Sequence, residues 1–326
     1  MAHEHHTDPR NTVATRNNAV PSPSHVHVPA VRGGGFVTWI DRHLPVVFNV
    51  PTVALLSGLV GLPVILVLWT SLTDWRLISA EASRYVGLRN YTNVWTDERW
   101  VNAIWHTFYF AIASVALQLV LGFAAAFLLN RQVAGKTVYR SVFMLPMIAM
   151  PTAISLVWII FFDNTYGLFN YWLKQMGLGP IGWTSNPRWV IPSLVLVSVW
   201  QHTPFMALLI LAGLQSLPAD PFEAARIDGA SKWQTFVNIT LPLLRGHIAV
   251  ALILRSIFAL KEFDIIAVIT YGGPNWGSET MNMNIYFSAF EYGYMGMASA
   301  KGVLFFCFIL AMQLVLIRLR RREWSY

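Results

Sequence analysis

Charged residues are scarce in this chain of 326 residues, because only 12% are Asp, Glu, Lys or Arg. That is about half the usual share of a globular protein, which excludes a large solvated surface. Cysteine is nearly absent as well, since Cys307 is the only one. An internal disulfide and a metal site built on paired thiols are therefore excluded. Cys307 lies in an apolar run, where a buried structural role is expected.

Apolar residues are correspondingly abundant. They make up 55% of the chain, aromatics reach 14%, and the mean hydropathy is +0.49. Apolar runs of 18 or more residues indicate membrane spans, because about 20 helical residues cross the roughly 30 Å hydrocarbon layer. Lipid leaves a lone segment no other way to satisfy its backbone, so each span is expected to be a helix. The sequence thus predicts an all-α polytopic membrane protein with six spans, at 46–72, 102–129, 138–162, 190–215, 246–270 and 297–318.

The distribution of positive charge predicts the orientation. With the N-terminus inside, 14 of the 23 Lys and Arg residues fall in cytoplasmic segments, and seven fall in the longer segments of the opposite side. Positive residues concentrate in short cytoplasmic loops of membrane proteins. Both termini are therefore expected in the cytoplasm, and the net charge of +7 fits membrane topology better than nucleic-acid binding.

Three regions follow from this pattern: a tail at 1–45, a transmembrane domain at 46–319 and a basic tail at 320–326. The first tail is rich in Pro, Ser, His, Asn and Gly and is expected to be disordered in the cytoplasm. It has no apolar stretch before residue 46 that would suit a signal peptide. Its "HEHH" segment (His3, His5, His6) is more simply a flexible His-rich terminus than a metal site.

The loop at about 217–245 interrupts two apolar runs with a polar stretch that carries helix signals at both ends. Asp220 followed by Pro221 is expected to cap a first helix, with Glu223 completing a capping box. Gly229 suits the left-handed residue that ends it. Ser231 with Gln234 repeats the cap pattern, and Pro242 should stop or kink the second helix. This helix-Gly-helix hairpin, with Phe222, Trp233 and Phe236, is shaped to dock into a partner; the alternative is an amphipathic helix lying on the headgroups.

The hairpin also carries a recognisable spacing. The pattern is Glu-Ala-Ala, three residues, Gly, nine residues, Ile, one residue and Leu-Pro. It resembles the EAA motif of permease subunits of binding-protein-dependent ABC importers. The matching positions, with Asp228 beside the glycine, are Glu223, Ala224, Ala225, Asp228, Gly229, Ile239, Leu241 and Pro242. "RNYTNVW" and "FDIIAVITYGGP" are similar to the carbohydrate-uptake branch, which handles oligosaccharides, polyols and glycerol-3-phosphate, and within it to the first of the two permeases.

This resemblance implies a transport subunit in the bacterial inner membrane and not an enzyme. The loop would be the coupling helix seated in a separate ATPase dimer, which binds ATP and Mg, so no cofactor is expected in this chain. A second permease and an extracytoplasmic solute-binding protein would complete the importer. "NRQVAGKT" (130–137) does not contradict this, because a P-loop needs Gly where Asn130 stands and needs an α/β context.

Charged groups inside a span are costly and therefore need a reason. The fifth predicted span carries four of them, and on one continuous helix Arg255 and Glu262 would differ by about 20° and Lys261 and Asp264 by about 60°. Two interpretations stay open, a face lining the translocation pathway and internal ion pairs at the interface with the partner permease. Other candidates for the pathway are polar or aromatic at mid-membrane depth. They are Ser114, Gln118, Trp158, Trp200, Gln201, His202 and Thr203, with Pro204 expected to kink its helix.

The external segment after the fifth span is rich in Gly, Asn and aromatic residues. In importers of this type the outer loops receive the solute-loaded binding protein, so the resemblance makes Trp276 and Tyr286 candidate contacts. The alternative is aromatics packing at the membrane surface. A polytopic membrane enzyme is disfavoured, because His106, His202 and His247 are scattered and no HExxH or Gly-x-Ser-x-Gly is present. An importer for another solute, such as a polyamine or phosphate, remains the closer alternative.

Overall fold

The computed structural model describes residues 35–79, 81–131 and 135–322. The chain divides into two compact units, Met1–Leu59 and Val60–Tyr326. Within the described residues it is almost entirely helical, and the only β contact there is an isolated bridge between Thr73 and Tyr85. The expected all-α class is therefore confirmed.

The first unit contains α1 (Gly35–Leu56), and a π-helical turn (η1, Ser57–Gly61) follows it. The helix begins at Gly35, inside the stretch 1–45 that the composition predicted to be disordered. Residues 1–34, with the His-rich segment, lie outside the described part, as do 323–326 of the basic tail.

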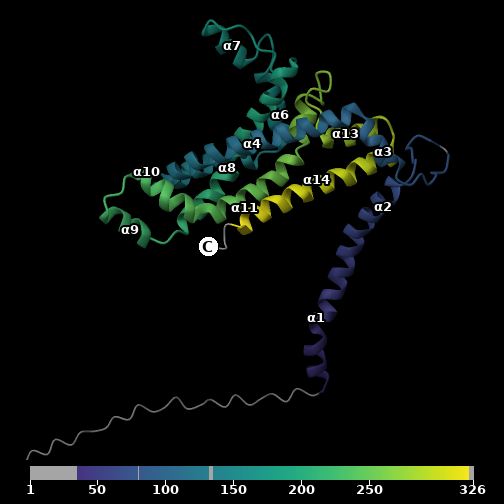
Figure 1. Cartoon of the computed structure of the whole chain (residues 1–326), viewed down its shortest axis with the longest axis horizontal. Coiled ribbons are helices and arrows are strands. Elements are labelled where there is room, and N and C mark those ends of the chain that lie inside the picture. The colour runs from purple at the N-terminus through teal and green to yellow at the C-terminus, as the bar shows by residue number, and fades with distance from the viewer. Residues whose placement is uncertain (1–34, 80, 132–134, 323–326) are drawn as a thin grey trace, which may run out of the picture. The chain divides into compact units, whose positions relative to one another are not determined.

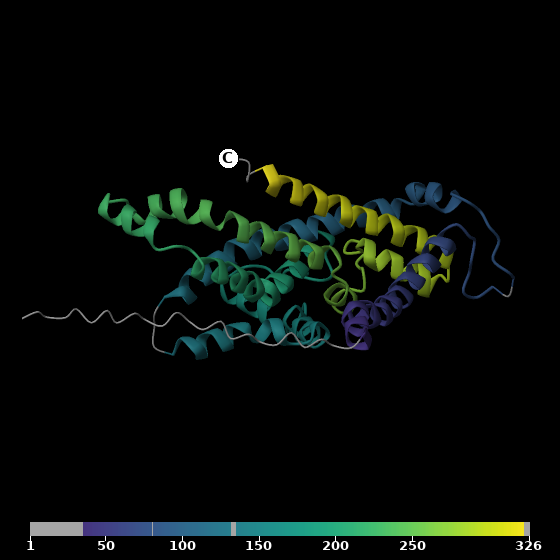
Figure 2. The ribbon, with the colours of Figure 1, turned by 90° about the horizontal axis from the view of Figure 1, so that it is seen from below.

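The second unit holds the remaining elements (Figures 1 and 2). In chain order they are α2 (Leu62–Ser71), α3 (Arg89–Thr96), α4 (Glu98–Asn130), α5 (Lys136–Ile148), α6 (Pro151–Phe161), α7 (Leu168–Gln175), α8 (Pro187–Gln215), α9 (Asp220–Ile227), α10 (Lys232–Thr235), η2 (Phe236–Thr240), α11 (Leu241–Leu260), α12 (Asp264–Ile269), α13 (Met281–Tyr286), η3 (Phe287–Glu291) and α14 (Met295–Arg322).

Five helical stretches of the described chain are long and apolar enough to cross a membrane, the fourth of them made of α10 to α12: Phe48–Ser71, Glu98–Asn130, Pro187–Gln215, Lys232–Ile269 and Met295–Arg318. They match five of the six predicted spans. The remaining one, the third along the chain, was predicted as one helix over 138–162. It is instead a pair of helices, α5 and α6, bent by 91°. Met150 before Pro151 is extended (ψ 129°), because a proline ring disfavours the helical conformation of the residue before it.

The fifth predicted span is interrupted too. α11 ends at Leu260, Lys261 is its C-cap, and a new helix begins only at Asp264. The continuous helix that would have paired Arg255 with Glu262 and Lys261 with Asp264 does not exist. Among the described residues no salt bridge joins either pair. The predicted single-helix geometry is therefore wrong, although Arg255 and Glu262 still interact electrostatically.

The core gathers around α8, which packs on α4, α5 and α11. Two-thirds of the apolar window of α8 is buried (67%), whereas the other spans bury at most a third. A helix that is apolar all round is buried all round, which fits the sequence of α8. It runs through Pro192 and Pro204 as one helix, and the Thr203 hydroxyl donates to the Val199 carbonyl at 2.6 Å. α8 is thus the central helix of the second unit.

Figure 1 shows α9 and α10 at one end of the packed helices and α13 with α3 at the other. We call these the α9 end and the α13 end. Phe123 and Phe127 on α4 contact Phe236 at the α9 end. At the α13 end, α14 packs on α3 and α13. The two ends carry different chemistry.

Candidate functional site

The α9 end presents a tight helical hairpin. α9 stops in a Schellman motif, since the Ala230 amide donates to the Ala225 carbonyl at 2.9 Å and the Gly229 amide donates to Arg226 at 3.3 Å. Gly229 has φ +70°, and a Cβ added there would meet nothing within 4 Å. The requirement for glycine is therefore conformational and not steric crowding. The expected helix-Gly-helix geometry is present.

The two ends of this hairpin are capped differently. The predicted Asp220 cap is wrong, because Ala219 is the N-cap of α9 and the carboxylate of Asp220 makes no capping hydrogen bond. Asp220 lies one residue inside the helix, where an acidic side chain still favours the helix dipole. The Ser231 capping box is confirmed, with Ser231 and Gln234 bonded reciprocally at 3.2 and 2.8 Å.

Pro242 neither stops nor breaks the helix that follows. The backbone widens into the π-helical turn η2 just before it, and α11 then continues from Leu241. Proline lacks an amide and its ring crowds the preceding turn, so a locally wider helix is one way to accommodate it. Leu241 is partly exposed, Ile239 is half-buried in η2, and Pro242 lines a groove with Arg245 and His247.

The surface of the hairpin combines charge with exposed apolar side chains. Glu223, Ala224 and Asp228 are exposed, whereas Ala225 is buried. Ile227 is 86% exposed and Trp233 71% exposed. The sequence analysis did not single out Ile227, although its place two residues before Gly229 puts it at the tip. A rigid hairpin that leaves an isoleucine and a tryptophan in solvent has the character of a protein-docking element.

Mid-way along the second unit, a polar cluster joins α4, α8 and α11. Arg255 is 0% exposed, and its Nε donates to Gln118 Oε1 at 2.6 Å. Its Nη2 donates to Ser198 Oγ at 3.1 Å, and Gln118 Nε2 donates to the Ser198 carbonyl at 3.0 Å. Charge-assisted hydrogen bonds are roughly twice as strong as neutral ones, so this cluster ties three helices together. Ser198 is the member that sequence reasoning missed.

The other predicted pathway residues differ in burial. Ser114, Gln118, Trp158 and Gln201 are buried with Arg255. Three buried atoms of the group, Ser114 Oγ, Gln201 Oε1 and Arg255 Nη1, have no hydrogen-bond partner in the described chain. His202 and Glu262 are half-buried, and Lys261 and Asp264 are exposed.

Trp158 belongs to an aromatic cluster. Its ring packs against Phe162, Phe169 and Trp200, with centroids 5.3, 5.7 and 5.8 Å away. Phe169 stacks on the ring and Trp200 meets it edge-on, and each such aromatic pair contributes about 0.5–1.5 kcal/mol. Trp200 is the more accessible of the two tryptophans, with 46% of its surface exposed.

The α13 end carries an ionic network that the sequence analysis did not find. Arg99 Nε lies 2.6 Å from Glu279, and Lys301 Nζ lies 2.9 Å from Asp97. Asn284 joins the two pairs, because it donates to Glu279 at 2.5 Å and accepts from Lys301 at 2.7 Å. Burial raises the pKa of Glu279, while hydrogen bonds from Arg99 and Asn284 oppose that rise. The network links α4, α13 and α14 to the loop before α13.

That loop forms a cavity of about 450 Å³ at the α13 end. Trp276 is 56% exposed there, and the Arg99 guanidinium lies 5.0 Å from its ring centroid. Tyr286, the other predicted contact, is half-buried between Phe263 and Phe290. Tyr271, Asn275 and Trp276 all have positive φ, a strained arrangement for non-glycine residues that often marks functional loops.

These features define a polytopic membrane protein with a docking hairpin at one end and an ion-paired loop cluster at the other. Residues 118–324 match the family described as the binding-protein-dependent transport system inner membrane component. The chain belongs to this family. It is a multi-pass membrane subunit of a transport system rather than an enzyme. Among the described residues no group of three or more His, Cys, Asp or Glu could hold a metal ion.

Several characterised relatives cover most of the chain. It is 38% identical to the trehalose/maltose transport system permease protein MalF of Thermococcus litoralis, over 83% of this chain and 91% of that protein. It is 34% identical to the sulfoquinovosyl glycerol permease SmoG of Agrobacterium fabrum, over 87% and 92%. It is 31% identical to the trehalose permease SugA of Mycobacterium tuberculosis, over 86% and 89%.

The fold also matches a solved structure. A chain of the bacterial alginate ABC transporter, in complex with an alginate pentasaccharide-bound periplasmic protein, superposes with a TM-score of 0.77. The match covers 88% of this chain and 98% of that chain at 21% sequence identity. The two chains therefore share one arrangement of helices.

Proposed function

We propose that this chain is the permease subunit of an ABC importer for a carbohydrate or a related polyol. The observation that carries the proposal is the rigid hairpin around Gly229, which leaves Ile227 and Trp233 exposed at one end of the spans. The family membership supports a transport role, and the sugars that MalF, SmoG and SugA are named for support the solute class.

In the proposed mechanism the hairpin docks into a separate ATPase on the cytoplasmic side, where both termini would also lie. ATP and Mg bind to that ATPase, whose closure moves the hairpin. A second permease would complete the translocation path, and a solute-binding protein would dock at the α13 end, against Trp276. ATP and the solute-loaded binding protein must both favour the outward-facing state, because a ligand shifts a population only through differential affinity.

The path itself is proposed to pass beside the cluster of Arg255 and Gln118. The partnerless atoms Ser114 Oγ, Gln201 Oε1 and Arg255 Nη1 support this, because buried polar atoms are costly when nothing bonds to them. A hydroxyl-rich solute supplies both donors and acceptors. Trp200 and the exposed Lys261 and Asp264 would then guide the solute toward and away from this point.

Purification of the chain from its native membrane in mild detergent, followed by mass spectrometry of what accompanies it, tests the assembly. Recovery of an ATPase, a second permease and a solute-binding protein is the expected result. Glu223→Lys and Gly229→Pro should leave the chain inserted but remove the ATPase or uncouple it from uptake. Normal uptake and normal ATPase coupling in both variants would refute the role of the hairpin.

A further inference from the structure

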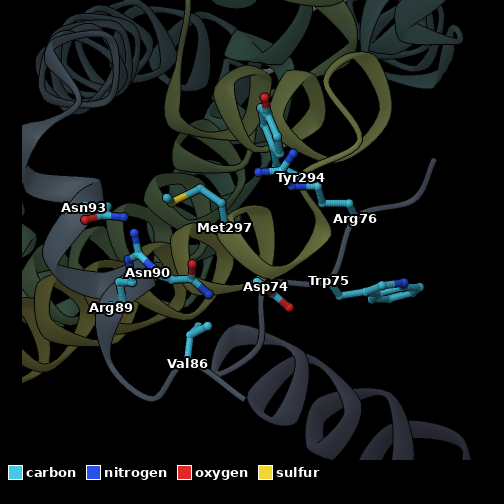
Figure 3. Close-up of a pocket in the computed structure, with 9 residues that line it drawn as sticks. All are labelled: Asp74, Trp75, Arg76, Val86, Arg89, Asn90, Asn93, Tyr294 and Met297. Atoms are coloured by element: carbon cyan, nitrogen blue, oxygen red, sulfur yellow. The ribbon is translucent and has the colours of Figure 1, made fainter. Parts of the chain in front are cut away.

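A second pocket lies at the α13 end, apart from the Trp276 loop. It has a volume of about 310 Å³ and is formed by the segment after α2, by one face of α3 and by the start of α14 (Figure 3). Its lining residues are Asp74, Trp75, Arg76, Val86, Arg89, Asn90, Asn93, Tyr294 and Met297. Most of them lie outside the candidate spans, just beyond the point where the first span ends at Ser71.

The walls of this pocket are fixed by hydrogen bonds. Asn90, which is buried, donates from Nδ2 to the carbonyls of Ser71 and Thr73, both at 2.8 Å. The Gly296 amide donates to the Trp75 carbonyl at 3.0 Å. A Cβ on Gly296 would lie 2.1 Å from the Thr73 carbonyl oxygen, so only glycine permits this approach. The pocket is therefore preformed.

Two arginines enter the pocket without an acidic partner. Figure 3 shows Arg76 beside Tyr294 on one side and Arg89 near Asn93 on the other. The Arg76 guanidinium lies 5.1 Å from the Tyr294 ring centroid, which holds it in place. Among the described residues neither arginine forms a salt bridge, whereas Arg84 nearby pairs with Glu81. Asp74, the one acid in the lining, accepts the Arg84 amide at 2.6 Å.

We propose that this pocket receives an acidic side chain, Asp or Glu, from the surface of the solute-binding protein. This inference rests on the proposed function, which brings that protein to the α13 end. A guanidinium binds a carboxylate through two parallel hydrogen bonds, and Arg76 is held against Tyr294 before any partner arrives. Met297 and Trp75 would cover the methylene groups of the entering side chain. The site is thus a polar anchor separate from Trp276.

The test uses the full complex with the ATPase and second permease, in nanodiscs of phosphatidylcholine. The probe is the solute-binding protein identified by co-purification, and its dissociation constant is measured against salt concentration. Arg76→Glu and Arg89→Glu should each weaken binding about tenfold or more, with a smaller effect at high salt. Arg84→Glu is the matched control, because it lies on the same loop outside the pocket lining. The dissociation constant of the binding protein for the Arg84→Glu complex should stay unchanged.

A charge exchange separates the anchor from a folding defect. Replacement of the contacting acid of the binding protein by Lys should restore binding to Arg76→Glu and weaken binding to the native chain. Unchanged affinity in both arginine variants, with the complex intact, overturns the proposal while leaving the importer function standing. In a second set of nanodiscs that also contain phosphatidylglycerol, loss of this bound lipid in the arginine variants without any change in affinity also overturns it, because the pocket would then hold a lipid headgroup. If no binding protein is recovered with the complex, the proposed function and this anchor fall together.

Discussion

Arg255 shows how one buried cation is made tolerable in a span. It has no acidic partner within salt-bridge distance in the described chain, and its donors go to neutral oxygens of Gln118 and Ser198. A neutral acceptor adds no second buried charge, and it still satisfies part of the guanidinium. Each acceptor therefore matters, because a buried charged group whose donor is left unsatisfied incurs its full desolvation penalty.

We therefore predict that Gln118→Leu destabilises the protein by about 1.5–3 kcal/mol, because Arg255 Nε loses its acceptor. The thermal unfolding midpoint in detergent measures this. The double variant Gln118→Leu with Arg255→Met should lose less stability than the two single variants lose in sum, since removing both partners avoids an unpaired buried charge. Strict additivity in this cycle would contradict the assigned contact.

A second residue-level prediction concerns Lys301, which binds Asp97, Asn284 and Ser288. Lys301→Met should lower the unfolding midpoint. The loss should be below the roughly 3–5 kcal/mol of a fully buried pair, because Asp97 is 35% exposed. Hydrogen exchange should rise in α13 and the loop before it, and stay unchanged in α9. Faster exchange at both ends would indicate general unfolding instead.

At the scale of elements, the hairpin depends on one backbone conformation. Gly229→Asn should retain ATPase association, since asparagine tolerates positive φ, whereas Gly229→Val should lose it. The strain is of the order of 1–2 kcal/mol for a residue with a Cβ. Co-purification of the ATPase with each variant measures this. Equal association in both would show that the φ of residue 229 has no bearing on docking.

Sequence alone anticipated elements well where length or local chemistry decides them. The apolar runs predicted the spans. The ends of the hairpin helices were predicted from Gly229, Ser231 and Gln234, because these residues bond only to near neighbours in the chain. The bend before Pro151 was missed, although the residue before a proline resists the helical conformation. The break after Leu260 could not be predicted, since Lys261–Phe263 carries no glycine or proline. The α13 network was out of reach, because Arg99 and Glu279 are 180 residues apart.

At the scale of the whole molecule, the proposed docking surface of the α9 end can be tested without disturbing the fold. Ile227→Glu should abolish ATPase association, because a charge would replace the most exposed apolar side chain of the hairpin. The unfolding midpoint should stay unchanged, since the side chain contacts solvent. Lys232→Glu, also exposed on the hairpin, serves as a charge control. Retained association in Ile227→Glu would remove the hairpin tip from the interface.

The exposed Ile227 and Trp233 have a consequence for a copy of the chain that finds no ATPase. Such a copy keeps an apolar tip in water, and exposed apolar patches of this kind are what chaperones and proteases of the cell act upon. In the proposed assembly the ATPase would cover the tip and end that exposure. The two side chains would then distinguish unassembled copies from assembled ones. Surplus copies would be degraded, and the amount of this subunit would stay matched to that of the ATPase.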